Sequence, residues 1–336
     1  MHSLGILISM AERSSWTPLH ARLHRTLRSR QLLERNQRLL VAVSGGQDSL
    51  CLIKLLLDLQ SKWGWQLGIA HCDHRWRPDS EEAANYVEQL ARTWQISFYC
   101  STAQQLLKSE AAARQWRYQA LSTIAGENNY NCIVTGHTAS DRAETLLYNL
   151  IRGSGADGLQ ALTWRRSLGS GIELVRPLLE VTRAETAQFC QDMHLAVWED
   201  STNQDLKYAR NRIRQELLPY LQTHFNPQVE QALAQTAELL QAEVEYLELA
   251  AHQLKRAAEA GRVQLNRRVL QTSPLALQRR VMRQVLQQAL KRTPSFEQIE
   301  KLTALITAPN GSVTDPFPGG AIAEVKGDWI WLKPEV

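Results

Sequence analysis

The chain has 336 residues, a net charge of +4, and 44% hydrophobic and 21% charged residues, a composition typical of a globular protein with roughly two domains. Its N-terminal apolar run, residues 4–8, is too short for a signal-peptide core, and no stretch is long enough to span a bilayer, so we expect a cytoplasmic protein without membrane contacts. The cysteines at 51, 72, 100, 132 and 190 are too widely spaced for a C-x-x-C metal or redox pair. Because the net charge is small, any nucleic acid must bind a local basic patch.

Residues 39–49 form the first stretch with recognisable chemistry. A short apolar run predicts a buried strand, which a Ser-Gly-Gly turn connects to a largely buried helix. This arrangement directs free backbone N–H groups at an anion, and the serine hydroxyls can donate to phosphate oxygens. An aspartate in such a loop is expected to hold Mg²⁺, whereas the missing lysine excludes a Walker A loop. The alternative is an ordinary tight turn. The predicted phosphate contacts are Ser44, Gly45, Gly46, Gln47, Asp48 and Ser49, with Asp48 as the metal ligand.

Strands and helices alternate around this loop. Before it, residues 13–38 carry seven arginines and one acid, which predicts either a solvated helix face or a nucleic-acid-binding fringe. After it, we expect strands at 66–71, 96–100 and 131–136, helices at 81–94 and 109–127, an extended segment at 172–179 and a capped helix from 182. This alternation predicts a parallel sheet with right-handed crossovers, in which ligands gather at the carboxyl ends of the strands.

A second polar cluster ends the strand predicted at 66–71. It contains His71, Asp73, His74 and Arg77. Zinc would need further ligands, and no nearby cysteine is placed to supply one. A strand end that faces a nucleotide is the interpretation we favour over a metal site, so these four residues are candidate nucleotide contacts.

A third cluster opens a predicted helix after the strand at 131–136. Asp141 and Glu144 stand three positions apart, so both carboxylates share one face of that helix, and His137 precedes its first turn. Two carboxylates and an imidazole beside a phosphate loop can bind Mg²⁺, hold an amine or accept a proton. The alternative is a helix start whose acids merely complement the helix dipole.

Further along, the pattern Gly-x-Gly-x-x-Gly at 153–158 follows a helix rather than a strand, so it is not a dinucleotide fingerprint. Arg210, Arg212 and Arg214 lie within five positions, as either solvated surface or phosphate contacts. Residues 227–258, rich in Ala, Gln, Leu and Glu, predict one long helix between two domains, which we place at 1–220 and 221–336.

The second domain carries a basic stretch. Residues 262–292 contain eight cations and no acid, and much of the stretch has helical periodicity, which favours a phosphate-binding surface over a solvated helix face. Two strands around a Lys-Gly-Asp turn are predicted at 321–332. We therefore expect a smaller, mostly helical α+β domain after the parallel-sheet α/β domain. The predicted nucleic-acid contacts of both domains are Arg210, Arg214, Arg267, Arg268, Arg279, Arg280 and Arg283.

Six motifs follow Ser-Gly-Gly-x-Asp-Ser in order along the chain. They are His-x-Asp-His-x-x-Arg-Pro, Gly-His-x-x-x-Asp-x-x-Glu-Thr, Arg-Gly-Ser-Gly, Arg-Pro-Leu-Leu, Glu-Asp-Ser-x-Asn and Arg-Asn-x-x-Arg. The ordered set covers about residues 39–220 and resembles the tRNA(Ile)-lysidine synthetase family, in its short form, within the N-type ATP pyrophosphatases of the PP-loop superfamily. The last motif falls on Arg210, Asn211 and Arg214, so Arg212 is an additional base.

The resemblance implies a ligase that uses ATP and Mg²⁺ to join L-lysine to carbon 2 of the wobble cytidine of tRNA(Ile) with a CAU anticodon. The loop at 44–49 would bind the pyrophosphate of ATP, and the third cluster would bind lysine or metal. The cytidine would first be adenylated with release of pyrophosphate, and lysine would then displace AMP, which changes decoding from AUG to AUA. A homodimer is left open.

Two other functions share some of these features. One is an ATP-dependent amidotransferase-like or thiolase relative with a small-molecule substrate, although the C-x-x-C pairs usual in tRNA thiolases are absent here. The other is a tRNA-binding protein whose ATP site only switches its shape. Pyrophosphate release in the presence and absence of lysine and tRNA separates all three.

Overall fold

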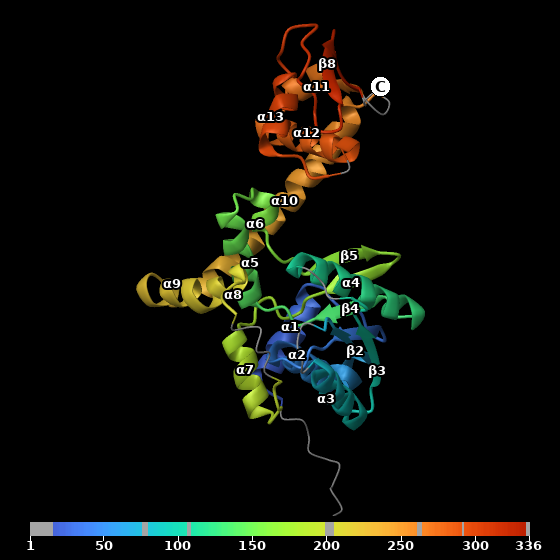
Figure 1. The fold of residues 1–336 in the computed structure, drawn as a ribbon, viewed down its shortest axis with the longest axis vertical. Helices are drawn as coiled ribbons and strands as arrows, with labels where there is room; N and C mark the ends of the chain where they lie inside the picture. The colour runs from blue at the N-terminus through green and yellow to red at the C-terminus, as the bar shows by residue number, and fades with distance from the viewer. Residues whose placement is uncertain are drawn as a thin grey trace, which may run out of the picture. The chain divides into compact units, whose positions relative to one another are not determined.

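Figure 1 shows the protein as a computed structural model, which describes residues 16–75, 80–105, 109–198, 205–260, 264–290 and 292–333. The chain forms two compact units, Met1–Glu238 and Leu239–Val336, which divide inside the long helix α10 (Val229–Ala258). The boundary placed at 220–221 from the sequence lies before that helix. The first turns of α10 belong with the first unit because Glu238 accepts hydrogen bonds there from Arg142 and Trp164.

Six strands form the sheet of the first unit, in the order β3-β2-β1-β4-β6-β5. They are β1 (Arg38–Ala42), β2 (Gln66–Asp73), β3 (Ser97–Thr102), β4 (Cys132–Thr135), β5 (Arg165–Gly169) and β6 (Ile172–Val175). Neighbouring strands are parallel except for β5, which pairs antiparallel with β6. The predicted parallel α/β sheet is confirmed. The sequence did not predict β5, since its Arg-Arg-Ser-Leu-Gly lacks the apolar run of a buried strand and lies at a sheet edge.

Helices cover both faces of this sheet because its inner strands are apolar on both sides. In β1, Leu39 and Val41 belong to one core cluster and Leu40 to another. The first cluster packs α1, α2, α3 and α7 on the sheet, and the second packs α4 on its other face. The helices of the unit are α1 (Pro18–Ser29), α2 (Gln47–Trp63), α3 (Ser80–Thr93), α4 (Glu110–Glu127), α5 (Ala139–Ile151), α6 (Ala156–Leu159), α7 (Arg183–Asp192), α8 (Ala209–Arg212), the π-helical turn η2 (Ile213–Leu217) and α9 (Leu218–His224).

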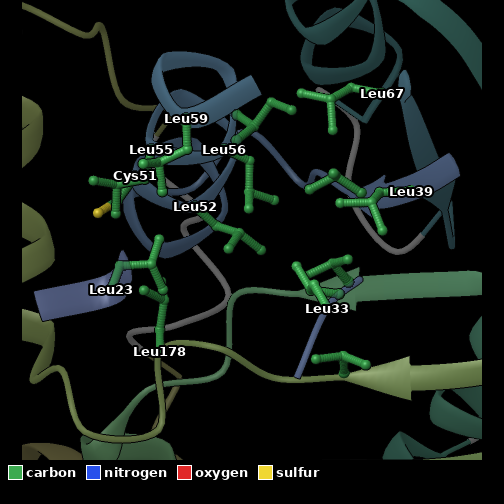
Figure 2. Packing of buried hydrophobic residues seen from close by; sticks show 14 of the residues in the cluster. Leu23, Leu33, Leu39, Cys51, Leu52, Leu55, Leu56, Leu59, Leu67 and Leu178 are labelled. Carbon is green, nitrogen blue, oxygen red and sulfur yellow. The ribbon is translucent and has the colours of Figure 1, made fainter. Parts of the chain in front are cut away.

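Helix α2 is the most deeply packed element beside the sheet. Leu52, Leu55 and Leu56 are fully buried, and Figure 2 shows them in the same cluster as Leu39 of β1. Each buried leucine contributes roughly 1.5–3 kcal/mol relative to an exposed one. This packing holds the N-terminus of α2, which directly follows the Ser-Gly-Gly turn, at a fixed position relative to the strands.

In its described residues, the second unit contains the remainder of α10, three further helices, and a three-stranded antiparallel sheet in the order β7-β9-β8. The predicted long helix and the two C-terminal strands are confirmed, whereas β7 was not predicted. None of the helices in the described ranges is long and apolar enough to cross a membrane. The elements are β7 (Gln264–Asn266), α11 (Arg267–Gln271), α12 (Leu275–Leu290), α13 (Phe296–Ala304), β8 (Ile322–Lys326) and β9 (Trp329–Lys333).

Candidate active site

The carboxyl ends of three parallel strands meet at one cavity of about 190 Å³. β1 leads into the Ser-Gly-Gly turn, β2 into His74 and β4 into Gly136. Because these strands are neighbours in the order β2-β1-β4, each of the three polar clusters seen in the sequence contributes to the cavity wall. Its polar lining residues are Ser44, Asp48, Ser49, His74, Arg117, Thr135, His137, Asp141 and Arg183.

The turn after β1 presents an open helix N-terminus to the cavity. Gly45 has a left-handed φ of +90°, which reverses the chain between β1 and α2. The Ser49 hydroxyl donates to the Gly46 carbonyl at 2.8 Å and accepts from the Ser44 N–H at 3.1 Å, so both serines brace the turn. Among the described residues no side chain caps α2, which leaves its first N–H groups and its dipole available to an anion.

Gly136 and Gln47 set how closely β4 and α7 approach the start of α2. A Cβ at Gly136 would lie 2.7 Å from the Asp48 carbonyl oxygen, so only glycine lets the end of β4 approach the start of α2 this closely. The Gln47 amide donates to the Arg183 carbonyl at 2.8 Å and to the Thr186 hydroxyl at 3.2 Å. Gln47 therefore ties α2 to α7 and does not line the cavity, in contrast to Asp48 and the two serines.

Arg183 lies among three carboxylates, although the sequence did not single it out. Its guanidinium nitrogens lie 3.1 Å from Asp48 Oδ2, 3.0 Å from Asp141 Oδ1 and 3.2 Å from Glu144 Oε1. It is the first residue of α7, and the predicted Thr-x-x-Glu capping box fixes that helix start. The signal that the sequence offers for Arg183 is its place directly after the capping residue Thr182, because its partners are 39 to 135 positions away.

The two acids of the third cluster differ in what holds them. Asp141 Oδ2 accepts from the Thr138 N–H and hydroxyl at 2.8 and 2.9 Å, so this residue does cap α5, and its other oxygen faces Arg183. The Glu144 side chain is only 3% exposed, and Arg214 donates to its two oxygens at 2.6 and 2.8 Å. Arg214, predicted as a phosphate contact, thus lies against the acids of the site.

The electrostatics of the acids follow from this crowding. Burial raises the pKa of Asp48, and although Arg183 opposes the shift, the Asp141 carboxylate adds to it. Burial would likewise raise the pKa of Asp141, but neighbouring groups together outweigh burial and hold that pKa below its usual value, namely Arg183, His137, the Thr138 N–H and Arg214. Asp48 is therefore the more easily neutralised of the two, while Asp141 stays ionised.

His137 is kept uncharged. Burial lowers its pKa to about 3, Arg176 adds to the shift, and Asp141 opposes it. The ring Nδ1 lies 2.9 Å from the Thr135 hydroxyl, which fixes its orientation in the cavity wall. At neutral pH this imidazole can exchange hydrogen bonds with a ligand without adding positive charge.

The second cluster is only partly in the cavity. The buried His71 ring hydrogen-bonds the Val43 carbonyl through Nδ1 at 2.9 Å, and Asp73 accepts from the Arg75 N–H at 2.7 Å, so both stabilise the chain locally. His74 lines the cavity and packs edge-on against Trp116 with ring centroids 5.2 Å apart. Arg77 lies outside the described residues.

Asp48 is the metal ligand predicted from the sequence. Within the described ranges, no group of three or more His, Cys, Asp or Glu side chains is arranged to hold an ion, so the alternative of a zinc site at the second cluster finds no support. Mg²⁺, however, usually binds through one or two carboxylates together with substrate phosphates. Asp48, beside the open N-terminus of α2, fits that mode of binding.

Most of the other arginines predicted to bind nucleic acid already contact groups within the protein. The guanidinium of Arg210 lies 5.8 Å from the Tyr148 ring centroid. In the second unit, Arg267 donates to the Ala308 carbonyl at 2.6 Å, and other elements supply the acids that the basic stretch itself lacks. The ion pairs are Arg268 with Asp328, Arg279 with Glu300, and both Arg280 and Arg283 with Glu248.

These pairs bear on a test of the basic stretch. Replacing Arg279, Arg280 and Arg283 together by glutamine should lower the melting temperature, because Glu248 then loses both of its cationic partners while half-buried and, in the described part of the chain, keeps only the hydrogen bond from Gln284. If the three arginines also contact tRNA, the slope of log affinity against log salt falls by ~1 unit per lost phosphate contact. We expect a change of at most ~1 unit, from Arg279, whose side chain is 41% exposed. Thermal melts give the change in stability, and tRNA binding across a salt series gives the change in slope. If neither changes, the three arginines contribute to neither stability nor tRNA binding and are simply solvated.

Comparison with known proteins places these features in a family. A PP-loop domain model matches residues 17–221, and a TilS substrate binding domain model matches residues 265–328. The tRNA(Ile)-lysidine synthase of Nostoc sp. is 69% identical over 95% of this chain and 97% of its own length. That of Synechocystis sp. is 52% identical over 94% of this chain and 98% of its own length.

Among solved structures, a U34-tRNA thiolase from Methanococcus maripaludis superposes with a TM-score of 0.57 over 66% of this chain and 77% of that chain. At 15% identity this likeness shows a shared fold alone. The two family models and the high identity with the curated relatives identify the family as well as the fold. They show that this chain is a PP-loop ligase of the tRNA(Ile)-lysidine synthase family, and the PP-loop domain model covers the Ser-Gly-Gly turn and the acids beside it.

Proposed function

We propose that this ligase, as a monomer or a homodimer in the cytoplasm, joins L-lysine to carbon 2 of the wobble cytidine of tRNA(Ile) with a CAU anticodon. ATP is split to AMP and pyrophosphate through an adenylated cytidine, and the lysidine formed changes decoding from AUG to AUA. The proposal is supported by the names of the curated relatives and by the ordered motifs.

One observation carries the proposal furthest. The uncapped start of α2 and two carboxylates, Asp48 and Asp141, line the same small cavity. Together with the buried Glu144, these acids surround the guanidinium of Arg183, a cation on an alkyl chain. Acids that surround one such cation can hold another, and the ε-ammonium of lysine is a cation on an alkyl chain. The site therefore suits an amine substrate held next to a nucleotide phosphate.

In the first half-reaction, the 2-oxygen of cytidine attacks the α-phosphate of ATP as the bond to the β-phosphate breaks. The turn at 44–46 and the N-terminus of α2 bind the departing pyrophosphate. Mg²⁺, held by Asp48 and the phosphates, would supply neutralising charge there. His137, uncharged at neutral pH, accepts or donates a hydrogen bond in the cavity wall.

In the second half-reaction, the ε-amine of lysine forms a bond to carbon 2 as the bond between that carbon and the AMP oxygen breaks. Asp141 and Glu144 hold the ammonium before it loses its proton and attacks. For the ammonium to bind there, Arg183 must give up some of its contacts with these acids. Its three carboxylate contacts therefore make it a direct competitor of the amine.

Omission of each substrate in turn tests the proposed function. With ATP and a tRNA(Ile) transcript, one pyrophosphate per enzyme should be released without lysine, and lysine should be required for AMP release and turnover. A transcript with its wobble cytidine replaced by uridine is the matched control and should release none. Turnover with tRNA but without any need for lysine would point to a thiolase-like relative, and ATP binding without pyrophosphate release would point to a binding protein.

A further inference from the structure

Three arginines gather around one buried tyrosine on the face of the sheet covered by α4. The guanidinium carbons of Arg114 and Arg117, both on α4, lie 5.7 and 5.5 Å from the ring centroid of Tyr118. That of Arg166, on the edge strand β5, lies 5.6 Å from the same centroid. Figure 1 shows α4 and β5 next to each other. Three like charges thus share one ring 8% exposed to solvent.

These charges have no acidic partner in the described part of the chain. Arg114, Arg117 and Arg166 form no ion pair with an Asp or Glu there, whereas the adjacent Arg165 pairs with Glu173 at 3.3 Å. Crowded guanidinium groups repel one another, and a carboxylate is the usual means of relieving that repulsion. The group instead offers an excess of positive charge to an external anion.

The pKa of Tyr118 reflects the positive charge around the ring. Burial raises the pKa of Tyr118, but the cations of Arg117, Arg176 and Arg114 outweigh burial and lower the pKa to about 8. Arg176 is only 1% exposed, so it contributes to the potential at Tyr118 but cannot contact a ligand at the surface. The accessible cations are therefore those of α4 and β5.

A depression of about 420 Å³ opens beside these cations. Two arginines and four neutral side chains able to donate hydrogen bonds line it, namely Arg114, Arg166, Gln115, Gln119, Ser122 and Ser167. Planar guanidinium forks together with amide and hydroxyl donors are the groups that bind phosphate oxygens. We call this depression the Tyr118 pocket.

The pocket neighbours the active site along α4. Arg117 lines the active-site cavity, and Arg114 lines the Tyr118 pocket one helical turn away. A polynucleotide carries a phosphate every few ångströms, so a strand that places one base in the cavity brings further phosphates to this surface. ATP, by contrast, would have its phosphates at the N-terminus of α2.

We propose that the Tyr118 pocket binds a backbone phosphate of the tRNA anticodon stem-loop close to the modified nucleotide, through Arg114 and Arg166. The inference rests on the proposed function, because it takes tRNA as the substrate of the adjacent cavity. The pocket thereby adds a contact in the catalytic unit to those predicted in the second unit.

The test is the variant Arg114→Gln/Arg166→Gln, which leaves Arg117 and the active-site cavity intact. Its affinity for the tRNA(Ile) transcript should fall at least ~10-fold, and the slope of log affinity against log salt should flatten by ~1 unit per lost phosphate contact. In pyrophosphate release, the KM for tRNA should rise while the rate at saturating tRNA stays near that of the unmodified protein. Affinity for ATP should not change.

The matched control is Arg92→Gln/Arg165→Gln, which removes the same net charge from the same unit at arginines already paired with Glu88 and Glu173. Equal losses in the two variants would reduce the effect to net charge and overturn the proposal, as would a loss of ATP affinity that matches the loss for tRNA. If the double variant melts early, Arg166→Gln alone, exposed on the edge strand, gives the same test with half the change in slope. Pyrophosphate release by the unmodified protein separates a failure of this proposal from a failure of the proposed function. If the unmodified protein releases no pyrophosphate, the proposed function is rejected. If it does release pyrophosphate but the variant binds tRNA normally, only the role of the Tyr118 pocket is rejected.

Discussion

Asp48→Ala is expected to reduce ATP-dependent pyrophosphate release by at least ~100-fold, a loss typical of removing one group that stabilises charge at a reacting phosphate. Asp48 is the carboxylate nearest the open start of α2, and it is the expected ligand of the Mg²⁺ that neutralises the phosphates. tRNA affinity should be nearly unchanged, because the basic surfaces lie elsewhere. Single-turnover pyrophosphate release, measured beside tRNA binding, gives both values.

Asp192→Ala is the matched control for that variant, because Asp192 is an exposed acid at the end of α7 whose hydrogen bond is to Gln188. It should leave release unchanged. Thermal melts are needed for both proteins, since Asp48 also receives hydrogen bonds from Arg183 and Thr186. Normal release by a folded Asp48→Ala protein would remove this residue from the metal role.

Glu144→Gln is expected to separate the two half-reactions. An amide keeps the shape of the side chain but loses the negative charge that offsets Arg214 and Arg183, so the two arginines repel an ammonium group placed beside them. Adenylated tRNA should still form, while transfer of lysine should fall by ~100-fold or more, since a hydrogen-bonded charge is removed from a buried site. Quenched reactions with ATP labelled in the α-phosphate and with labelled lysine would quantify the two products separately.

The control for this variant is Glu127→Gln, an exposed glutamate at the last turn of α4. It should transfer lysine at the unmodified rate. Accumulation of the adenylate in Glu144→Gln alone supports a role in binding the amine. Loss of both half-reactions together would place Glu144 with Asp48 in the handling of ATP and Mg²⁺ instead.

Much of the fold was predictable because its signals are local. Apolar runs of four to eight residues followed by Gly or polar clusters identified β1, β2, β3 and β4, and the Thr182 capping box identified the start of α7. The strand β5 carried no such signal, since an edge strand does not need apolar residues on both faces. Strand order then brought the three polar clusters together, because parallel strands joined by right-handed crossovers end on the same side of a sheet.

The α/β class, the Ser-Gly-Gly turn before α2, the paired acids of α5 and the family resemblance could all be read from the sequence, because each depends on residues close together in the chain. Only the tertiary structure decided which charges meet. Arg183 reaches Asp48 across 135 positions, and Arg280 meets Glu248 across 32, so that a stretch without acids is neutralised from other helices. No periodicity encodes such pairs, because long side chains find their partners only after helix packing has set the distances between their backbones.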